Sequence, residues 1–190
     1  LRQICCDPAL CFEDYTGESA KLETCVSLIA SASAAGHKIL LFSQFASMLE
    51  RIRERLLQEG ISSHLLVGAT PKEERSRMVQ AFASDEVSVF LISLKAGGTG
   101  LNLTAADIVI HYDPWCNVAA QNQATDRAYR IGQEKPVTVY KLILKDTIEE
   151  NLLKLQNAKL ALAAQVVSEG MVSLGDLSQN ELMELFEQNP

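Results

Sequence analysis

The sequence lacks the long apolar segments and the paired cysteines that are typical of membrane and secreted proteins. No apolar run approaches the roughly 20 residues that a membrane-spanning helix needs, and the N-terminus carries no signal-peptide pattern. The five cysteines are odd in number and form no Cys-x-x-Cys pair, which argues against a disulfide framework and against a zinc site. We therefore expect a cytoplasmic protein without a membrane partner or a bound structural metal.

The sequence also lacks the motifs of a complete ATP-hydrolysing site. It contains no GxxxxGKS/T phosphate loop and no DEAH-like run to hold Mg²⁺ and position water, and P-loop hydrolysis depends on both. The three histidines stand singly, without a Cys, Asp or Ser at a catalytic spacing. Any ATP hydrolysis therefore requires a further domain, and we expect the chain to be a segment of a longer protein.

Basic residues are too few for a nucleic-acid-binding surface that spreads over the whole chain, because the net charge is -7 at pH 7. The charges are unevenly distributed. Residues 91–145 carry six Lys and Arg against four Asp and Glu, whereas residues 146–190 carry two against eight. We therefore expect any nucleic-acid contact to be local and central, with the acidic C-terminal part facing elsewhere.

Short apolar runs alternate with amphipathic helical patterns, which is typical of an α/β fold. The run VSVFLISL is β-branched and nearly all apolar, as expected for a central parallel strand covered on both faces. The pattern predicts a doubly wound, mostly parallel sheet with flanking helices, whose functional groups lie on loops at the carboxyl ends of the strands. The predicted strands are 38–42, 61–67, 87–94, 108–112 and 137–144, and the predicted helices are 19–35, 44–58, one opening at 70–73, 118–131, 147–167 and 178–188.

Three segments follow from this pattern. Residues 1–17 contain Pro8 and Gly17 and show no sustained period, so we interpret them as an entering linker. Residues 18–145 contain the alternating strands and helices. Residues 146–190 contain two helices without a strand between them, which predicts a C-terminal helical extension that packs on this domain or on another one.

The stretch NVAAQNQATDRAYRIGQ, residues 117–133, is predicted to be an arginine-bearing helix. Asn117 is a suitable N-cap, and no proline or glycine interrupts residues 118–131. Helical spacing would place Gln123, Arg127 and Arg130 along one face, where two guanidinium groups and an amide suit phosphate oxygens. The alternative is structural: Asp126 and Arg130 form a solvated pair, and Arg127 covers apolar surface.

A glycine-rich turn, KAGGTGLNLT at residues 95–104, follows the predicted strand 87–94. Glycines let backbone N–H groups turn toward an anion at no Cβ cost. The spacing matches neither GxxxxGKS/T nor GxGxxG, so the turn does not hold a nucleotide by itself. A simple reversal of the chain is the alternative.

Four other polar or aromatic residues admit both a structural and a functional interpretation. Trp115, the single tryptophan, is either packed in the core or exposed to a nucleic acid. Ser43 and Gln44 follow a strand, where the hydroxyl of Ser43 would cap the next helix. Thr70 opens a capping box, which explains the residue structurally, and a phosphate contact would be a second role.

Seven segments carry a family resemblance. They are LRQICCDP, ILLFSQF, GATPKEER, LKAGGTGLNL, DPWCN, QATDRAYRIGQ and TIEENLLKLQNAK. In this order and spacing the chain closely resembles the Swi/Snf-type DNA-translocating ATPases, which are relatives of superfamily-two helicases, over nearly its whole length. Cys116, Val118 and Gln121 depart from the family, which commonly has Trp, Pro and an acidic residue at these positions.

The resemblance implies a RecA-like fold for residues 18–145, as the second, C-terminal lobe of the motor. A first RecA-like lobe, outside this chain, would bind ATP with Mg²⁺. The resemblance further implies double-stranded DNA as partner, alone or in a protein–DNA complex, in the nucleoid of a bacterium or the nucleus of a eukaryote. The implied catalytic residues are Arg127 and Arg130, the implied nucleotide contacts are Gly98, Gly100, Gln123, Arg127 and Arg130, and the implied DNA contacts are Ser43, Gln44, Thr70, Lys95, Gly97, Thr99, Trp115 and Asn117.

Two other functions stay open at this point. An RNA helicase lobe would share the fold, although such lobes usually have HRIGR-like sequences where this chain has YRIGQ. A non-catalytic interaction module would use the acidic helices of residues 146–190 to bind a partner. Stimulation of ATP turnover by duplex DNA, by RNA or by neither separates the three.

Overall fold

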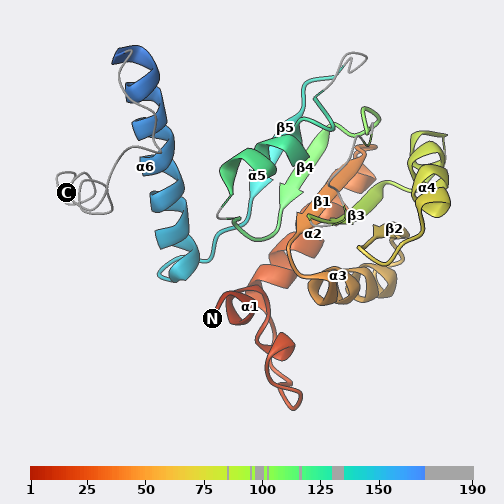
Figure 1. Ribbon diagram of the computed structural model, residues 1–190. Coiled ribbons are helices and arrows are strands. Elements are labelled where there is room, and N and C mark those ends of the chain that lie inside the picture. Colours follow the sequence, from red (N-terminus) through yellow and green to blue (C-terminus); the bar gives the residue numbers. More distant parts are fainter. Residues whose placement is uncertain are drawn as a thin grey trace.

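The computed structural model describes residues 1–84, 86–94, 96, 101, 103–115, 117–129 and 135–169, with the backbone alone for 162–169. Within this part of the chain, five parallel strands form a sheet in the order β2-β3-β1-β4-β5 (Figure 1). All five predicted strands are confirmed, as is the doubly wound α/β fold class. The strands are β1 Ile39–Ser43, β2 Ser63–Leu66, β3 Val89–Ser93, β4 Ile108–His111 and β5 Thr138–Lys141.

The central strands are buried on both faces because helices cover each side of the sheet. Side chains alternate along β1, so that Ile39 and Leu41 pack into one hydrophobic cluster while Leu40 and Phe42 pack into the other. The first cluster is closed by α1–α3 and the second by α4 and α5. The helices are α1 Arg2–Cys6, the 3-10 helix η1 Pro8–Leu10, α2 Ala20–Ala34, α3 Ala46–Gln58, α4 Lys72–Ser84, α5 Val118–Thr125 and α6 Ile148–Glu169.

Local signals set the ends of several helices. The hydroxyl of Ser19 accepts a hydrogen bond from the backbone N–H of Leu22 and caps α2. Gly36 and Gly60 follow α2 and α3 with φ of +83° and +75°, a left-handed conformation that favours glycine. The predicted helices that begin near residues 19 and 44 are confirmed within a few residues.

The predicted helix 118–131 is wrong at its C-terminal end. Helix α5 stops at Thr125, Asp126 is its C-cap, and residues 126–129 form a turn. Gln123 is exposed on α5, whereas Arg127 is buried beyond the helix end. These two side chains therefore do not share one helical face. Intrinsic helix propensity is a weak signal that tertiary packing overrides, and here the turn places Ala128 in the cluster beneath α5.

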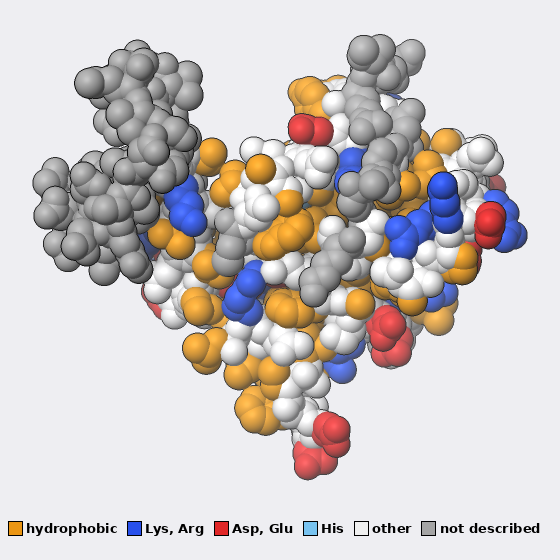
Figure 2. All heavy atoms as spheres, in the orientation of Figure 1, with side chains coloured by type: hydrophobic (Ala, Val, Ile, Leu, Met, Phe, Trp, Pro, Cys, Tyr) orange, Lys and Arg blue, Asp and Glu red, His pale blue; other side chains and the backbone are white. Residues whose placement is uncertain are grey.

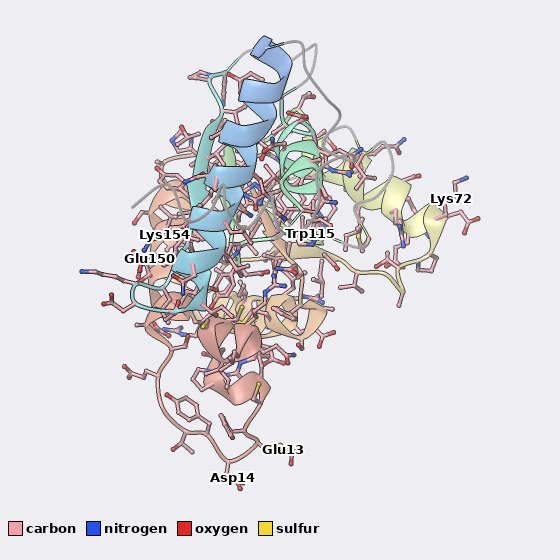
Figure 3. All side chains as sticks on the ribbon, turned by 60° about the vertical axis from the view of Figure 1, so that its left-hand side comes forward. Glu13, Asp14, Lys72, Trp115, Glu150 and Lys154 are labelled. Atoms are coloured by element: carbon pink, nitrogen blue, oxygen red, sulfur yellow. The ribbon has the colours of Figure 1, made fainter. Side chains whose placement is uncertain are left out.

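The first residues of the chain pack on the sheet domain. Helix α1 places Cys6 in the core, and the backbone carbonyl of Cys6 accepts a hydrogen bond of 2.8 Å from the hydroxyl of Tyr112. Asp7 is buried and accepts a hydrogen bond of 2.9 Å from Arg51 of α3. The acidic pair Glu13 and Asp14 lies at the tip of the loop that leads to α2 (Figure 3).

Helix α6 begins against the domain and then extends away from the sheet (Figure 1). Its first turn is held by a buried ion pair, in which the Lys21 ammonium group of α2 lies 2.6 Å from both carboxylate oxygens of Glu149. Leu155 of α6 is 39% exposed, whereas Gln156 is 5% exposed, so polar side chains rather than this leucine face the domain. The predicted helix 178–188 lies outside the described residues. No helix in the described part is long and apolar enough to cross a membrane.

Candidate functional site

Polar groups gather where β1, β3 and β4 end, at one edge of the sheet. Parallel strands bring their carboxyl ends to the same edge, which is where α/β sheets bind ligands. Ser43 and Ser93 pair in register at the ends of β1 and β3, and His111 ends β4 beside Phe42. The residues that follow β4 leave this edge and include Asp113 and two residues that the sequence had singled out, Trp115 and Asn117.

Asp113 is the buried centre of this edge. Its carboxylate accepts hydrogen bonds from the Ser43 hydroxyl at 2.5 Å, from the backbone N–H of Gln44 at 3.2 Å and from the Gln44 side-chain amide. Burial raises the pKa of Asp113, and the hydrogen bonds from Ser43 and Gln44 oppose that rise. Ser43 is fully buried, and the expected helix cap is wrong, because Phe45 is the N-cap of α3 and has no side-chain capping bond.

The backbone of Pro114 and Trp115 is held by four side chains from different parts of the chain. The Pro114 carbonyl accepts hydrogen bonds from Arg2 of α1 at 2.8 Å and from Gln44 at 2.9 Å. The Trp115 N–H donates to the side-chain carbonyl of Gln121 at 3.2 Å, and the Trp115 carbonyl accepts a hydrogen bond from the Gln156 amide. The loop is therefore fixed in position by α1, α5 and α6 together.

Trp115 and Asn117 flank the start of α5. Trp115 is half-buried, with its ring against the cluster beneath α5, and Figure 3 shows it below one end of α5. The ring therefore packs, as the structural interpretation expects, and keeps an exposed portion, while its contact with a nucleic acid stays a prediction. The Asn117 side chain accepts a hydrogen bond of 3.2 Å from the Ala120 N–H, which confirms the predicted N-cap while the residue itself stays exposed.

Thr70 lies in a second loop, which Arg75 of α4 ties to the end of β3. The Arg75 guanidinium donates to the carbonyls of Thr70 at 2.8 Å, Gly68 at 2.9 Å and Ala96 at 3.1 Å. The Thr70 hydroxyl accepts a hydrogen bond from the Val67 N–H at 3.1 Å. Since Ala96 belongs to the glycine-rich turn, Arg75 holds the two loops side by side.

Arg127 is 4% exposed and lies in the turn after α5. Its backbone carbonyl accepts a hydrogen bond of 3.2 Å from the Leu103 N–H, which links this turn to the segment that follows the glycine-rich turn. The isolated domain therefore encloses the Arg127 guanidinium instead of presenting it on an open surface. Asp126 is exposed.

Several predicted contacts lie outside the described residues. These are Lys95, Gly97, Gly98, Thr99, Gly100 and Arg130. Of the predicted nucleotide contacts, the structure therefore places Gln123, whose amide is exposed on α5, and Arg127. Among the described residues, no group of three or more His, Cys, Asp or Glu is arranged to hold a metal ion.

The sequence did not reveal Arg75, Asp113, Gln121 or Gln156 as parts of the site. Each acts through hydrogen bonds to backbone atoms or to residues distant in sequence, for example 41 residues between Gln156 and Trp115. No local period or motif signals such a contact. The one available signal was the position of Asp113 directly after an apolar strand, where loops of α/β sheets carry function.

His111 is a buried histidine whose protonation is coupled to folding. Its Nε2 lies 2.9 Å from the Thr125 hydroxyl, and burial, with a smaller contribution from Lys141, lowers its pKa from 6.5 to about 4. The unfolded chain then binds a proton at higher pH than the folded chain. We therefore expect the free energy of unfolding to fall as the pH drops from 6.5 toward about 4.

The His111→Gln variant tests this expectation. A shift from 6.5 to about 4 corresponds to at most about 3 kcal/mol, and the variant should lose less stability than the wild type over this pH range. The raised pKa of Asp113 has the opposite effect, because it lowers the free energy of unfolding as the pH rises. Both proteins contain Asp113, so this contribution cancels when the variant is compared with the wild type. Equal pH dependence in urea denaturation of the two proteins would contradict the expectation.

Comparison with known proteins places this geometry in a family. The model of the helicase conserved C-terminal domain matches residues 20–132. The chain is 43% identical to "Putative ATP-dependent helicase/translocase YwqA" of Bacillus subtilis, over 98% of this chain and 21% of that protein. It is also 43% identical to "Chromodomain-helicase-DNA-binding protein 1-like" of Danio rerio, over 88% of this chain and 16% of that protein. The chain thus spans about a fifth or less of the length of these curated relatives.

Solved structures agree with the sequence relatives. The "Sulfolobus solfataricus SWI2/SNF2 ATPase C-terminal domain" is 32% identical with a TM-score of 0.70, covering 97% of this chain and 77% of that one. The "SWI2/SNF2 ATPase core in complex with dsDNA" from the same organism is 34% identical with a TM-score of 0.72, covering 97% and 40%. These matches confirm the predicted RecA-like fold. The chain therefore belongs to the helicase conserved C-terminal domain family, as a C-terminal lobe of the SWI2/SNF2 type.

Proposed function

We propose that this lobe is the second motor lobe of an ATP-dependent translocase on double-stranded DNA. The observation that carries the proposal is the fixed loop 113–115 at the carboxyl edge of the sheet, which holds Trp115 half-exposed beside the exposed Asn117. A rigid loop with an aromatic ring and an amide suits contact with a sugar–phosphate backbone. The solved relative that contains duplex DNA supports the same partner.

The DNA contacts would be directed at phosphates and independent of base sequence. Lys95, Gly97 and Thr99 would grip the backbone from the glycine-rich turn, which Arg75 ties to the Thr70 loop through Ala96. Ser43 and Gln44 would act indirectly, because both hold Asp113. On the face drawn in Figure 2, Lys and Arg of the described residues form separate groups, which fits local phosphate contacts.

ATP would lie between this lobe and a first lobe that holds the triphosphate and Mg²⁺. The relatives named as ATP-dependent helicases support ATP as the nucleotide. On this lobe, the exposed amide of Gln123 fits a polar contact to the nucleotide, with Gly98, Gly100 and Arg130 as further candidates. Arg130 would neutralise charge that develops on the γ-phosphate, and Arg127 would do so once closure of the two lobes uncovers its side chain, which the isolated domain encloses. Closing and opening of the cleft would then move the two lobes along the duplex.

The surroundings of the motor are also a proposal. The relatives include a bacterial helicase and chromatin-remodelling proteins, so a protein–DNA complex is a reasonable substrate in either the nucleoid or the nucleus. The boundaries 1–17, 18–145 and 146–190 stay a prediction, although α1 and the start of α6 both contact the domain core.

The purified 190-residue chain is expected to hydrolyse no ATP, whereas the same chain joined to its first lobe should hydrolyse ATP faster when duplex DNA is added. The reason is that the phosphate loop and the Mg²⁺ ligands belong to the first lobe. Phosphate release should be measured for both proteins with duplex DNA, with RNA and with no nucleic acid. Turnover by the isolated chain would contradict the two-lobe proposal.

The nucleic-acid comparison separates the alternatives. Stimulation by RNA alone would favour an RNA helicase lobe, and no stimulation by either would favour a non-catalytic interaction module. A phosphate-loop lysine variant of the joined protein is the control, since it removes the activity of this motor but not that of a contaminating ATPase.

A further inference from the structure

Two buried glutamines meet at the backbone of Trp115. Gln121 of α5 is 3% exposed and Gln156 of α6 is 5% exposed. The Gln121 side-chain carbonyl accepts from the Trp115 N–H at 3.2 Å and from the Gln156 amide at 3.5 Å. The Gln156 amide also donates to the Trp115 carbonyl. The N–H and the carbonyl of one residue are thus satisfied by the same pair of side chains.

Packing alone does not explain why α6 turns a glutamine toward the domain. Burying an amide is unfavourable unless it is hydrogen-bonded, and the adjacent Leu155 is left 39% exposed. A hydrogen bond depends on distance and direction in a way that an apolar contact does not. The contact between α6 and the loop therefore fixes where Trp115 lies.

We propose that Gln156 is a positioning residue, which through its own amide and through Gln121 holds the Trp115 backbone so that the indole meets the sugar–phosphate backbone of duplex DNA in one orientation. This inference rests on the proposed function, because it takes Trp115 as a DNA contact. It also gives α6 a role within the site. Helix α6 supports the loop that would contact DNA.

The other side chains that hold this loop form hydrogen bonds with the residues before Trp115. Arg2 and Gln44 bind the Pro114 carbonyl, and Ser43 and Gln44 bind Asp113. Loss of the Gln156 amide should therefore release the Trp115 peptide while Asp113 and Pro114 stay in place. The expected effect is local and does not unfold the sheet.

Fluorescence of the 190-residue chain tests the positioning directly, because Trp115 is its single tryptophan. Gln156→Leu should shift the emission to longer wavelength and increase quenching by acrylamide, while the circular dichroism of the helices is retained. Gln156→Glu keeps the length but loses the N–H donor and should act in the same direction. Asn157→Leu, at the neighbouring exposed position, is the matched control and should leave the emission unchanged.

Variants of Gln121 separate hydrogen bonding from volume. Gln121→Glu keeps the oxygen that accepts from Trp115 and Gln156, so its emission should change less than that of Gln121→Leu. If a Gln156 variant loses its helical circular dichroism, Gln121→Leu decides instead. Emission and quenching equal to wild type in Gln156→Leu and Gln121→Leu would overturn the proposal.

The joined two-lobe protein tests the consequence for DNA. In Gln156→Leu the DNA concentration that gives half-maximal ATP turnover should rise about three- to tenfold, as the loss of one buried hydrogen bond implies. Turnover at saturating DNA should stay close to wild type, which a general loss of structure would not permit. An unchanged half-saturation beside an altered fluorescence would overturn the role in DNA binding. If the wild-type protein shows no response to DNA, the proposed function fails, and the fluorescence still decides whether Gln156 positions Trp115.

Discussion

Replacing Arg130 with alanine in the joined two-lobe protein is expected to lower ATP turnover by about 10³ to 10⁵, the range that arginine fingers contribute. In the proposed role the guanidinium charge acts only as the γ-phosphate begins to leave, so ATP affinity should change far less. Lysine should restore little activity, because the bidentate fork is lost. Steady-state turnover, nucleotide affinity and melting temperature should be measured for Arg130→Ala, Arg130→Lys and the wild type.

Arg127→Ala serves as the informative comparison, because the structure encloses this side chain in the domain at 4% exposure. We expect it to lower turnover and also the melting temperature of the isolated chain, since a truncated buried side chain leaves its surroundings unfilled. The two variants are thus expected to differ in melting temperature, which should fall in Arg127→Ala and stay close to wild type in Arg130→Ala. Near-normal turnover in both variants would assign them to a structural role. If Arg130→Ala loses activity together with a large drop in melting temperature, the role of Arg130 is structural.

Breaking the buried ion pair between Lys21 and Glu149 is expected to give the largest loss of stability, about 3–5 kcal/mol for either Lys21→Met or Glu149→Leu. Each single substitution leaves the other charge buried without its partner, and Glu149→Leu also removes the acceptor for the Leu144 N–H. The double variant Lys21→Met with Glu149→Leu should cost much less than the sum of the two. Urea denaturation of the 190-residue chain measures all three.

Arg55 provides the matched control, since it forms ion pairs with Glu23 and Glu59 at the surface of α3. Exposed pairs are screened by solvent, so Arg55→Met should change stability far less than either single variant of the buried pair. A loss in the single variants as small as that of Arg55→Met would show that solvent reaches Lys21 and Glu149 in the folded protein.

Signals that repeat along the chain allowed the sheet domain to be predicted. Apolar runs indicated the central strands β1, β3 and β4, which are buried on both faces. The alternation of strands with helices indicated that the sheet is parallel. Asn117 was predicted to cap α5 and does so, because an N-cap is a local hydrogen bond that involves only neighbouring residues. These features depend on short stretches, and short stretches are what a sequence shows directly.

The site was predicted less completely because its contacts join distant residues. Nothing near Gln156 indicates that it binds the Trp115 carbonyl, and nothing near Arg2 indicates that it binds Pro114. The error at the end of α5 has the same origin: Arg127 and Ala128 are good helix formers, yet both are buried in a turn. Helical spacing therefore placed Gln123 and Arg127 on one helix face, although the helix ends before Arg127.

The supports of the loop 113–115 also determine which shortened forms of this chain are useful. A fragment cut at residues 20–132, the bounds of the family match, would omit Arg2 and Gln156, which bind the Pro114 and Trp115 carbonyls. It would also leave Lys21 without Glu149. Such a fragment would keep most of the sheet and lose the shape of the loop, so ligand screening or crystallisation should use a piece that runs from Arg2 through at least Gln156.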